Sequence, residues 1–231
     1  MCDESEETVT THHDPNGKDW AHVTELRRRQ LPAGELEKFE GYMAEIFTAL
    51  GLDLDTPATC ETPRRHLQAL IDATDGYEGD PKLVKAFQTE CRGGADCLLS
   101  QVIEGPITFY SLCEHHALPF FGRAFVGYIA HEHILGLSKL ARLVQLFARR
   151  FAVQERIGQQ IANALDSILQ PHGVAVYLEA RHLCVEMRGV RQHGLLTHTT
   201  NFRGNYEKNA ALRAEFLTAC GLPGGSGTAR A

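Results

Sequence analysis

The sequence predicts an α+β fold in which helices back an antiparallel sheet. Two observations lead to this prediction. Segments rich in β-branched and aromatic residues occur in pairs with Gly and Pro between them, and amphipathic segments precede, separate and follow these pairs. The chain has 231 residues, 43% hydrophobic and 23% charged, which is enough for a well-buried core. No linker or internal repeat interrupts the middle of the chain, so we expect one continuous globular body.

The ends of the chain differ from its middle. Residues 1–30 are polar and acidic, and we expect a disordered tail. Residues 222–231 contain several glycines and predict a flexible C-terminal tail. We expect residues 31–95 to form a helical N-terminal extension and residues 96–221 to form the domain that holds the sheet.

The N-terminal extension is predicted to contain two helices. The stretch "ELEKFEGYMAEIFTALG" has a helical apolar period and ends at Gly51, and "TPRRHLQALIDAT" offers Thr62 as an N-cap with Pro63 as the first helical residue. The apolar face of the first helix consists of Leu36, Phe39, Tyr42, Met43, Ile46, Phe47 and Leu50.

The second part of the chain mixes strands and helices. Residues 97–113 and 120–130 predict strands. Residues 137–173 predict a helix that is long for a single one, so two helices remain an alternative. Residues 173–190 alternate in two runs around a polar break at Ala180–Arg181, which favours a hairpin, and residues 205–221 predict a closing helix.

Charge and composition exclude several classes of function. The net charge of −6 shows no basic excess of the kind that nucleic-acid binding requires. No apolar run reaches the length of a membrane span, and the acidic N-terminus has no secretory signal. Seven cysteines in no regular pattern argue against a disulfide framework. We therefore expect a cytoplasmic protein without a nucleic-acid or membrane partner.

The stretch "YSLCEHHALPF" suggests a metal site. Cys113 and His116 can offer a thiolate and an imidazole to one cation, and Cys184 is the best third ligand. His182, two residues before Cys184, would lie on the same face of a strand. Three protein ligands leave zinc an open position, as in catalytic zinc sites. Spacing alone leaves ordinary buried cysteines as an equally good explanation.

Two further histidines, and basic residues in the first turns of a predicted helix, could take part in catalysis and substrate binding. His115 and His182 could move protons beside the metal, although a single histidine is more often a core residue. In "LGLSKLAR", Ser138 could cap a helix whose first turns present Lys139 and Arg142 to a phosphate. A capped surface helix with solvated basic side chains is the alternative.

A carboxylate in the long helical segment could recognise a purine. If the helix were continuous, Glu155, next to Gln154, would lie on its apolar face, where a carboxylate must be paired or used. Such a carboxylate can accept two N–H groups from a purine edge. A surface ion pair with Arg156 is the alternative.

Four stretches together resemble the GTP cyclohydrolase I family. They are "SLCEHHALPFFG", "LGLSKLARLVQLFARR", "VQERIGQQIANAL" and "GVAVYLEARHLCVEMRGV", in this order, within a resemblance that covers roughly residues 36–220. The resemblance implies a tunnelling fold with an N-terminal helical extension. It also implies a homodecamer of two pentameric rings with active sites between subunits.

The resemblance assigns roles to particular residues. It implies that Cys113, His116 and Cys184 bind zinc, whose water attacks C8 of GTP, while His115 and His182 shuttle protons as C8 leaves as formate. The implied substrate-binding residues are Glu155 and Gln154 at the guanine, and Ser138, Lys139, Arg142, Arg188 and Arg65 at the ribose and triphosphate; Ser138 also counts as catalytic. The implied product is 7,8-dihydroneopterin triphosphate, the entry to folate and tetrahydropterin biosynthesis.

Some positions depart from the family pattern. Ala130 and Phe151 stand where proline is usual, and Leu195, His198 and Asn201 are unusual in a segment that is commonly rich in Ser and Thr. A divergent paralogue that acts on GTP in a deazaguanine or pterin secondary pathway, or that stops at a ring-opened intermediate, is therefore the main competing hypothesis.

Two more functions fit the sequence less well. A 7-cyano-7-deazaguanine reductase is disfavoured by the complete Cys113 and Cys184 metal set. A non-catalytic protein stabilised by zinc is disfavoured because mere structure does not need His115, His182, Glu155 and Lys139 together.

Overall fold

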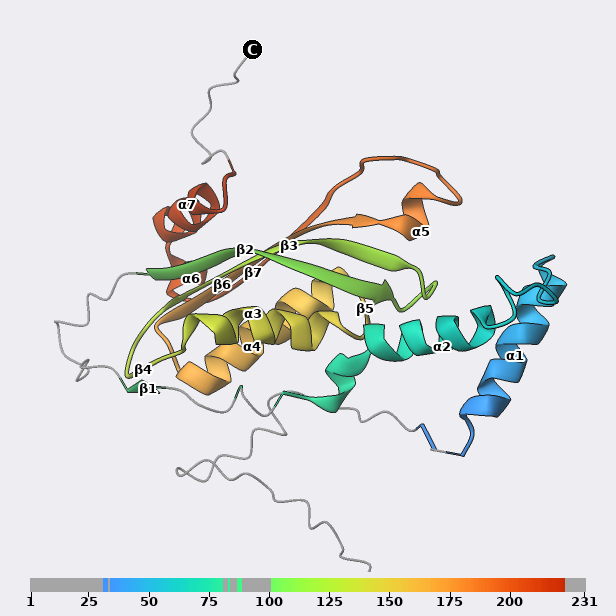
Figure 1. Ribbon diagram of the computed structural model, residues 1–231. Helices are drawn as coiled ribbons and strands as arrows, with labels where there is room; N and C mark the ends of the chain where they lie inside the picture. The colour runs from blue at the N-terminus through green and yellow to red at the C-terminus, as the bar shows by residue number, and fades with distance from the viewer. Residues whose placement is uncertain (1–30, 33, 81–82, 84–86, 89–100, 223–231) are drawn as a thin grey trace, which may run out of the picture.

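The computed structural model describes residues 31–32, 34–80, 83, 87–88 and 101–222, and it confirms an α+β fold (Figure 1). The expected tail at 1–30, most of the expected tail at 222–231 and the end of the expected extension at 89–95 lie outside these residues. The elements are α1 (Leu36–Ala49), α2 (Thr62–Ala73), the 3₁₀ helix η1 (Asp75–Glu78), β1 (Phe87–Gln88), β2 (Gln101–Cys113), β3 (Pro119–Ile129), β4 (His133–Ile134), α3 (Leu137–Ala148), β5 (Phe151–Ala152), α4 (Gln154–Leu169), β6 (Gly173–His182), α5 (Leu183–Glu186), β7 (Thr197–Gly204), α6 (Asn205–Lys208) and α7 (Ala210–Ala219).

The main sheet has the strand order β5-β2-β3-β6-β7. Strands β2, β3, β6 and β7 are antiparallel neighbours, and short β5 runs parallel to the end of β2, where Cys113 pairs with Ala152. Leu112 pairs with Pro119, and Phe120 pairs with His182. This register brings the carboxyl ends of β2 and β6, and with them Cys113 and His182, to the same end of the sheet.

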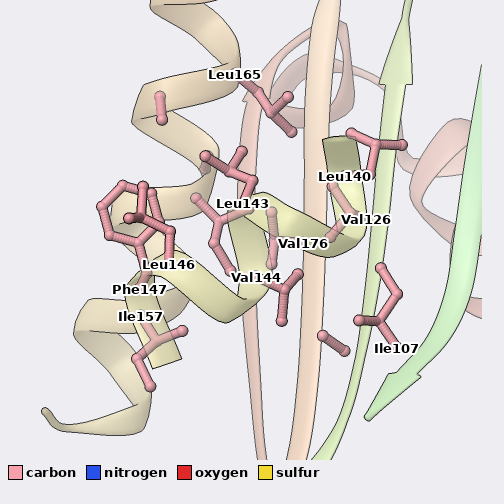
Figure 2. Packing of buried hydrophobic residues seen from close by; sticks show 14 of the residues in the cluster. Ile107, Val126, Leu140, Leu143, Val144, Leu146, Phe147, Ile157, Leu165 and Val176 are labelled. Carbon is pink, nitrogen blue, oxygen red and sulfur yellow. The ribbon is translucent and has the colours of Figure 1, made fainter. Parts of the chain in front are cut away.

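Helices α3 and α4 cover one face of the sheet with apolar side chains (Figure 2). Leu140, Leu143 and Val144 of α3 and Ile157 of α4 are fully buried in the same cluster as Val176 of β6. Each such side chain contributes roughly 1.5–3 kcal/mol through removal of its apolar surface from water. This layer holds α3, α4 and the sheet in one body.

Helices α6 and α7 lie on the opposite face of the sheet (Figure 1). Tyr206 and Phe216 pack there with Tyr177 in a second, smaller core. The first eight residues of β6 are therefore buried, whichever face they point to. A strand covered on both sides loses the polar alternation of a half-exposed strand.

The predicted hairpin in residues 173–190 is wrong. Residues Gly173–His182 form the single strand β6, and the short helix α5 follows it. The polar break at Arg181 marks the point where β6 leaves the core, not a turn between two strands. Cys184 consequently lies on α5 and does not share a strand face with His182.

The long helical segment is two helices, the alternative that its length left open. α3 ends at Ala148, β5 follows, and α4 begins at Gln154, so the continuous-helix argument for Glu155 is wrong. The expected caps differ as well. Glu61 precedes α2, which begins at Thr62, and Gly136 precedes α3; neither helix has a side-chain cap.

The two expected N-terminal helices are present and extend beyond the β5 end of the sheet (Figure 1). α1 packs against α2, where the Phe47 ring meets His66 edge-on at 5.2 Å between ring centroids. α1 buries none of its residues, and Tyr42, Ile46 and Leu50 are 51%, 50% and 80% exposed. Within the described part of the chain, much of the predicted apolar face of α1 therefore remains uncovered.

Candidate metal centre and active site

Cys113, His116 and Cys184 converge at one end of the sheet. One ligand atom from each lies within 4.8 Å of the others, and this is the one such group found among the described residues. Cys113 ends β2, and His116 follows in a tight turn in which the Ala117 N–H donates to the Cys113 carbonyl at 2.7 Å. The register of the sheet then brings in Cys184, which follows the end of β6.

An ion pair holds the helix that presents Cys184. Arg181 donates from Nε and Nη2 to the two carboxylate oxygens of Glu186, at 2.8 and 2.5 Å. The pair joins Arg181, just before α5, to the last residue of that helix, and the Glu186 carboxylate is 5% exposed. The hydrogen bond from Arg181 holds the pKa of Glu186 below its usual value. The pair therefore ties α5 to the end of β6.

The donors at this site fit zinc. Two thiolates and one imidazole are a donor set that zinc binds in proteins, at separations of roughly 3.3–3.8 Å between ligand atoms. Cys113 Sγ is 3.7 Å from His116 Nδ1. Burial raises the pKa of the Cys184 thiol, and the neighbouring Cys113 thiol raises it further.

The two predicted proton carriers flank the candidate metal ligands. His115 Nδ1 is 3.9 Å from Cys113 Sγ. The His182 ring stacks on Phe120, with 4.6 Å between centroids and 5° between planes. Burial lowers the pKa of His182, while the charge of nearby Glu155 acts in the opposite direction. The net effect favours a neutral imidazole, which can accept a proton at neutral pH.

Gln154 and Glu155 begin α4 beside His182. Glu155 is exposed, whereas Gln154 is 1% exposed. The Oε1 atom of Gln154 is 2.9 Å from His182 Nε2. The structure therefore brings both predicted guanine contacts to the metal centre, but Gln154 already has a protein partner there.

Glu114 connects the turn that holds His116 to α4. Its carboxylate accepts from both terminal nitrogens of Arg156, at 2.5 and 3.1 Å. Glu114, and not the adjacent Glu155, is therefore the ion-pair partner of Arg156. Because Arg156 lies in the first turn of α4, this bidentate pair links the turn with His116 to the helix with Glu155.

Ser138 and Lys139, two of the predicted phosphate contacts, are not brought to this centre within one chain. Ser138 lies at the end of α3 remote from β5, about 15 Å along the helix axis, with Lys139 beside it. A cavity of about 500 Å³ is lined by Ser138 and Arg142, and Arg142 there pairs with Asp80 at 3.2 Å.

The other two predicted phosphate contacts differ from each other in position. Arg188 follows α5 and acts electrostatically on Cys184. Arg65 lies in α2 and pairs with Glu61 at 2.9 Å. Arg188 is thus placed beside the candidate metal centre in the single chain.

Comparison with known proteins identifies the family. The model of the GTP cyclohydrolase I family matches residues 39–221. Proteins named GTP cyclohydrolase 1 from Campylobacter concisus and Porphyromonas gingivalis are 42% and 41% identical to this chain. The matches cover 81% and 86% of this chain and 96% and 98% of those proteins. The chain belongs to the GTP cyclohydrolase I family.

Two further matches differ in strength. The Saccharomyces cerevisiae protein named GTP cyclohydrolase 1 is 38% identical over 213 residues, which are 89% of this chain and 85% of that protein. The other match is to a crystal structure of the archaeosine synthase QueF-Like in the apo form. The match covers 46% of this chain and 92% of the archaeosine synthase chain, with a TM-score of 0.37 and 13% sequence identity. That likeness is too weak to support an argument.

The segment that departs from the GTP cyclohydrolase I pattern forms β7 and the loop before it. Gln154 Nε2 donates to the carbonyl of Thr197 and the hydroxyl of Thr199. His198, between them, faces the other side of the sheet and bonds the Tyr177 hydroxyl at 2.6 Å. Leu195 is 49% exposed. The segment therefore contacts the metal centre indirectly, through Gln154.

Sequence reasoning missed three contacts at this site: Glu114 with Arg156, Arg181 with Glu186, and Gln154 with His182. The spacing of Arg181 and Glu186 around Cys184 was a usable local signal. The other two pairs join residues 42 and 28 positions apart, and nothing local indicates which distant partner a polar side chain meets.

Proposed function

We propose that this chain is a zinc-dependent GTP cyclohydrolase that opens GTP at C8, releases formate and closes the rearranged product to 7,8-dihydroneopterin triphosphate. The observation that carries the proposal is the Cys113, His116 and Cys184 group with His182 beside it, in a member of the GTP cyclohydrolase I family. This product would enter folate or tetrahydropterin biosynthesis.

The metal that the donors fit best is zinc. Cys113, His116 and Cys184 would hold it and leave a fourth position open. Zinc bound there would act as a Lewis acid that makes water nucleophilic near neutral pH.

The protein side chains would bind the substrate and move its protons. His115 and His182 would transfer protons during opening of the imidazole ring and loss of formate, with Ser138 taking part in the later ribose steps. Glu155 would accept the N1 and N2 hydrogens of guanine. Lys139, Arg142, Arg188 and Arg65 would neutralise the triphosphate.

We also propose that the chain has the tunnelling fold and works as a homodecamer of two pentamers. Over residues 101–111, β2 has a neighbour on one side only, and β7 has a neighbour on one side only, so the described sheet has two open edges that copies of the chain could join. The uncovered face of α1 would also be buried by another copy.

The positions of the phosphate residues support a site shared between subunits. Ser138 lies away from the metal centre of its own chain, so a neighbouring copy would have to supply it. None of the helices in the described part of the chain is long and apolar enough to cross a membrane. We place the reaction in the cytoplasm, where thiol ligands stay reduced.

The decisive experiment is incubation of the zinc-loaded protein with GTP, followed by a formate assay and chromatography of the products. Formate together with a dihydropterin triphosphate is the expected result. Formate or an opened purine without a pterin would instead identify the divergent paralogue that the unusual residues Leu195, His198 and Asn201 suggest. Bound zinc with no consumption of GTP would contradict the proposal.

A further inference from the structure

The side-chain amide of Gln154 is buried and makes polar contacts on both of its ends. Gln154 is 1% exposed and is the first residue of α4. Its Nε2 atom lies 2.9 Å from the Thr197 carbonyl oxygen, 3.2 Å from the Leu178 carbonyl oxygen and 3.2 Å from Thr199 Oγ1. Its Oε1 atom lies 2.9 Å from His182 Nε2.

These contacts determine the orientation of the amide. Carbonyl oxygens can only accept hydrogen bonds, so the group that faces Thr197 and Leu178 must be the NH₂ group. The reversed amide would place Oε1 against two backbone carbonyl oxygens in a buried position, where neither carbonyl could donate to it, and it would lose both of these hydrogen bonds. Oε1 therefore faces His182.

The orientation of the amide in turn determines where the His182 proton lies. Oε1 has no hydrogen, so His182 Nε2 must be the donor in their contact. A neutral imidazole has one N–H group, and the lone pair is then on Nδ1. The stacked Phe120 ring, 4.6 Å away and nearly parallel, restricts rotation of the imidazole out of this plane.

We propose that Gln154 is a positioning residue that holds His182 as the Nε2–H tautomer and so leaves the lone pair of the neutral imidazole on Nδ1. This role differs from the guanine contact that the family resemblance implied for Gln154. The catalytic part of the inference rests on the proposed function, whereas the tautomer is a property of the protein alone. Strand β7 takes part, because Thr197 and Thr199 hold the amide in place.

The tautomer can be measured without substrate. Solid-state NMR of zinc-loaded protein labelled with ¹⁵N-histidine, at a pH where His182 is neutral, distinguishes protonated from unprotonated ring nitrogens. The His182 signals are those that disappear in His182→Asn. We expect a protonated Nε2 and an unprotonated Nδ1. A protonated Nδ1 in the wild-type protein would overturn the proposal, even if GTP turnover is never detected.

Kinetics of Gln154→Met then test the positioning role. This variant keeps the length of the side chain but removes the acceptor, so we expect a mixture of His182 tautomers and a fall in kcat of about 10- to 100-fold. KM should change by less than about threefold. A raised KM with an unchanged kcat and tautomer would mean that Gln154 binds guanine, and would overturn the proposal.

The matched control is Gln159→Met, the same exchange at an exposed position of α4. It should leave the His182 tautomer, kcat and KM unchanged. If Gln154→Met does not fold, Thr199→Val removes one of the three acceptors, and a smaller shift of the tautomer in the same direction is expected. Wild-type tautomer populations in Thr199→Val together with a wild-type kcat would count against the role of β7.

Discussion

At the scale of single residues, the surroundings of each cysteine decide whether it can contribute to the candidate metal centre. Among the described cysteines, Cys113 and Cys184 lie within reach of His116, whereas Cys60 is exposed and Cys220 is buried against α7. Burial raises the pKa of Cys220 to about 12, so its thiol stays protonated and unreactive. The same residue type thus occurs as a candidate ligand, as a surface group and as a core group.

Removal of a ligand and removal of a proton carrier should have different results. Cys184→Ala should lose both zinc and activity, because two ligands do not hold the ion as three do. His182→Ala should keep zinc and lose most turnover. Zinc content after gel filtration and formate release measure the two effects, with Cys60→Ala as a control that changes neither. Full zinc and full rate in Cys184→Ala would refute the assignment.

Gly122 of β3 illustrates a second constraint on a single residue. A Cβ atom there would lie 1.8 Å from the Glu179 carbonyl oxygen and 2.7 Å from the Ala180 Cα. Both contacts are backbone atoms of the neighbouring strand β6 and cannot move aside without shifting the strand. Glycine is therefore required at this close approach of β3 and β6.

Gly122→Ala should destabilise the fold by roughly 2–4 kcal/mol, because β3 and β6 must separate at the centre of the sheet. The matched control is Gly41→Ala inside α1, where a Cβ atom meets nothing within 4 Å. The control should be neutral or stabilise by about 0.5–1 kcal/mol. Urea unfolding monitored by circular dichroism compares the two. Equal stability of both variants would contradict the close approach.

At the scale of elements, α5 decides the geometry of the third ligand. The sequence pattern of residues 173–190 predicted a hairpin where β6 is a single strand that ends at His182. Because β6 is buried on both faces, its sequence lacks the alternation of polar and apolar residues that marks a half-exposed strand. Helix α5 has only four residues, which is too short for a periodic signal. Its position depends on the Arg181–Glu186 pair and on what packs around it.

Glu186→Gln should weaken this element in a pH-dependent way. The pKa of Glu186 is below its ordinary 4.5 in the folded protein, mainly through the hydrogen bond from Arg181. A lowered folded-state pKa means that the pair stabilises the protein above about pH 4.5, and that this stabilisation is lost as the pH falls through the folded-state value. The variant should therefore unfold more easily than wild type at pH 7.

Urea titrations at pH 7 and below about pH 4 measure this difference, which should shrink in acid. Glu207→Gln is the control, since Glu207 is 54% exposed and lies 4.0 Å from Arg203. It should cost almost nothing at either pH. A stability difference for Glu186→Gln that is the same at both pH values would contradict the explanation.

At the scale of the whole molecule, one chain leaves surfaces that a soluble protein usually covers. Within the described sheet, residues 101–111 of β2 and the outer side of β7 are open edges, and α1 exposes Tyr42, Ile46 and Leu50. Large apolar groups gathered on one helix face are typical of an interface between protein chains. The position of Ser138, at the end of α3 away from the candidate metal centre, points to the same conclusion.

Tyr42→Glu combined with Ile46→Glu should break the proposed assembly, because two charges would be buried in an apolar contact. Light scattering after size exclusion should show a smaller particle than wild type. Glu45→Gln, an exchange of an exposed residue of the same helix, should leave the size unchanged. A monomeric wild-type protein would refute the decamer outright.

The sequence by itself determined the α+β class, most strands and helices, the family and the three residues that could hold a metal. The fold class and its elements follow from local apolar periodicity. The candidate metal ligands follow from residue types that are typical of metal sites when they occur close together, such as Cys113 with His116. Tertiary structure decided that Cys184 lies on a helix, that Arg156 pairs with Glu114, and that Gln154 bonds His182. These depend on strand register and burial, which join distant residues, and a local pattern does not contain that information.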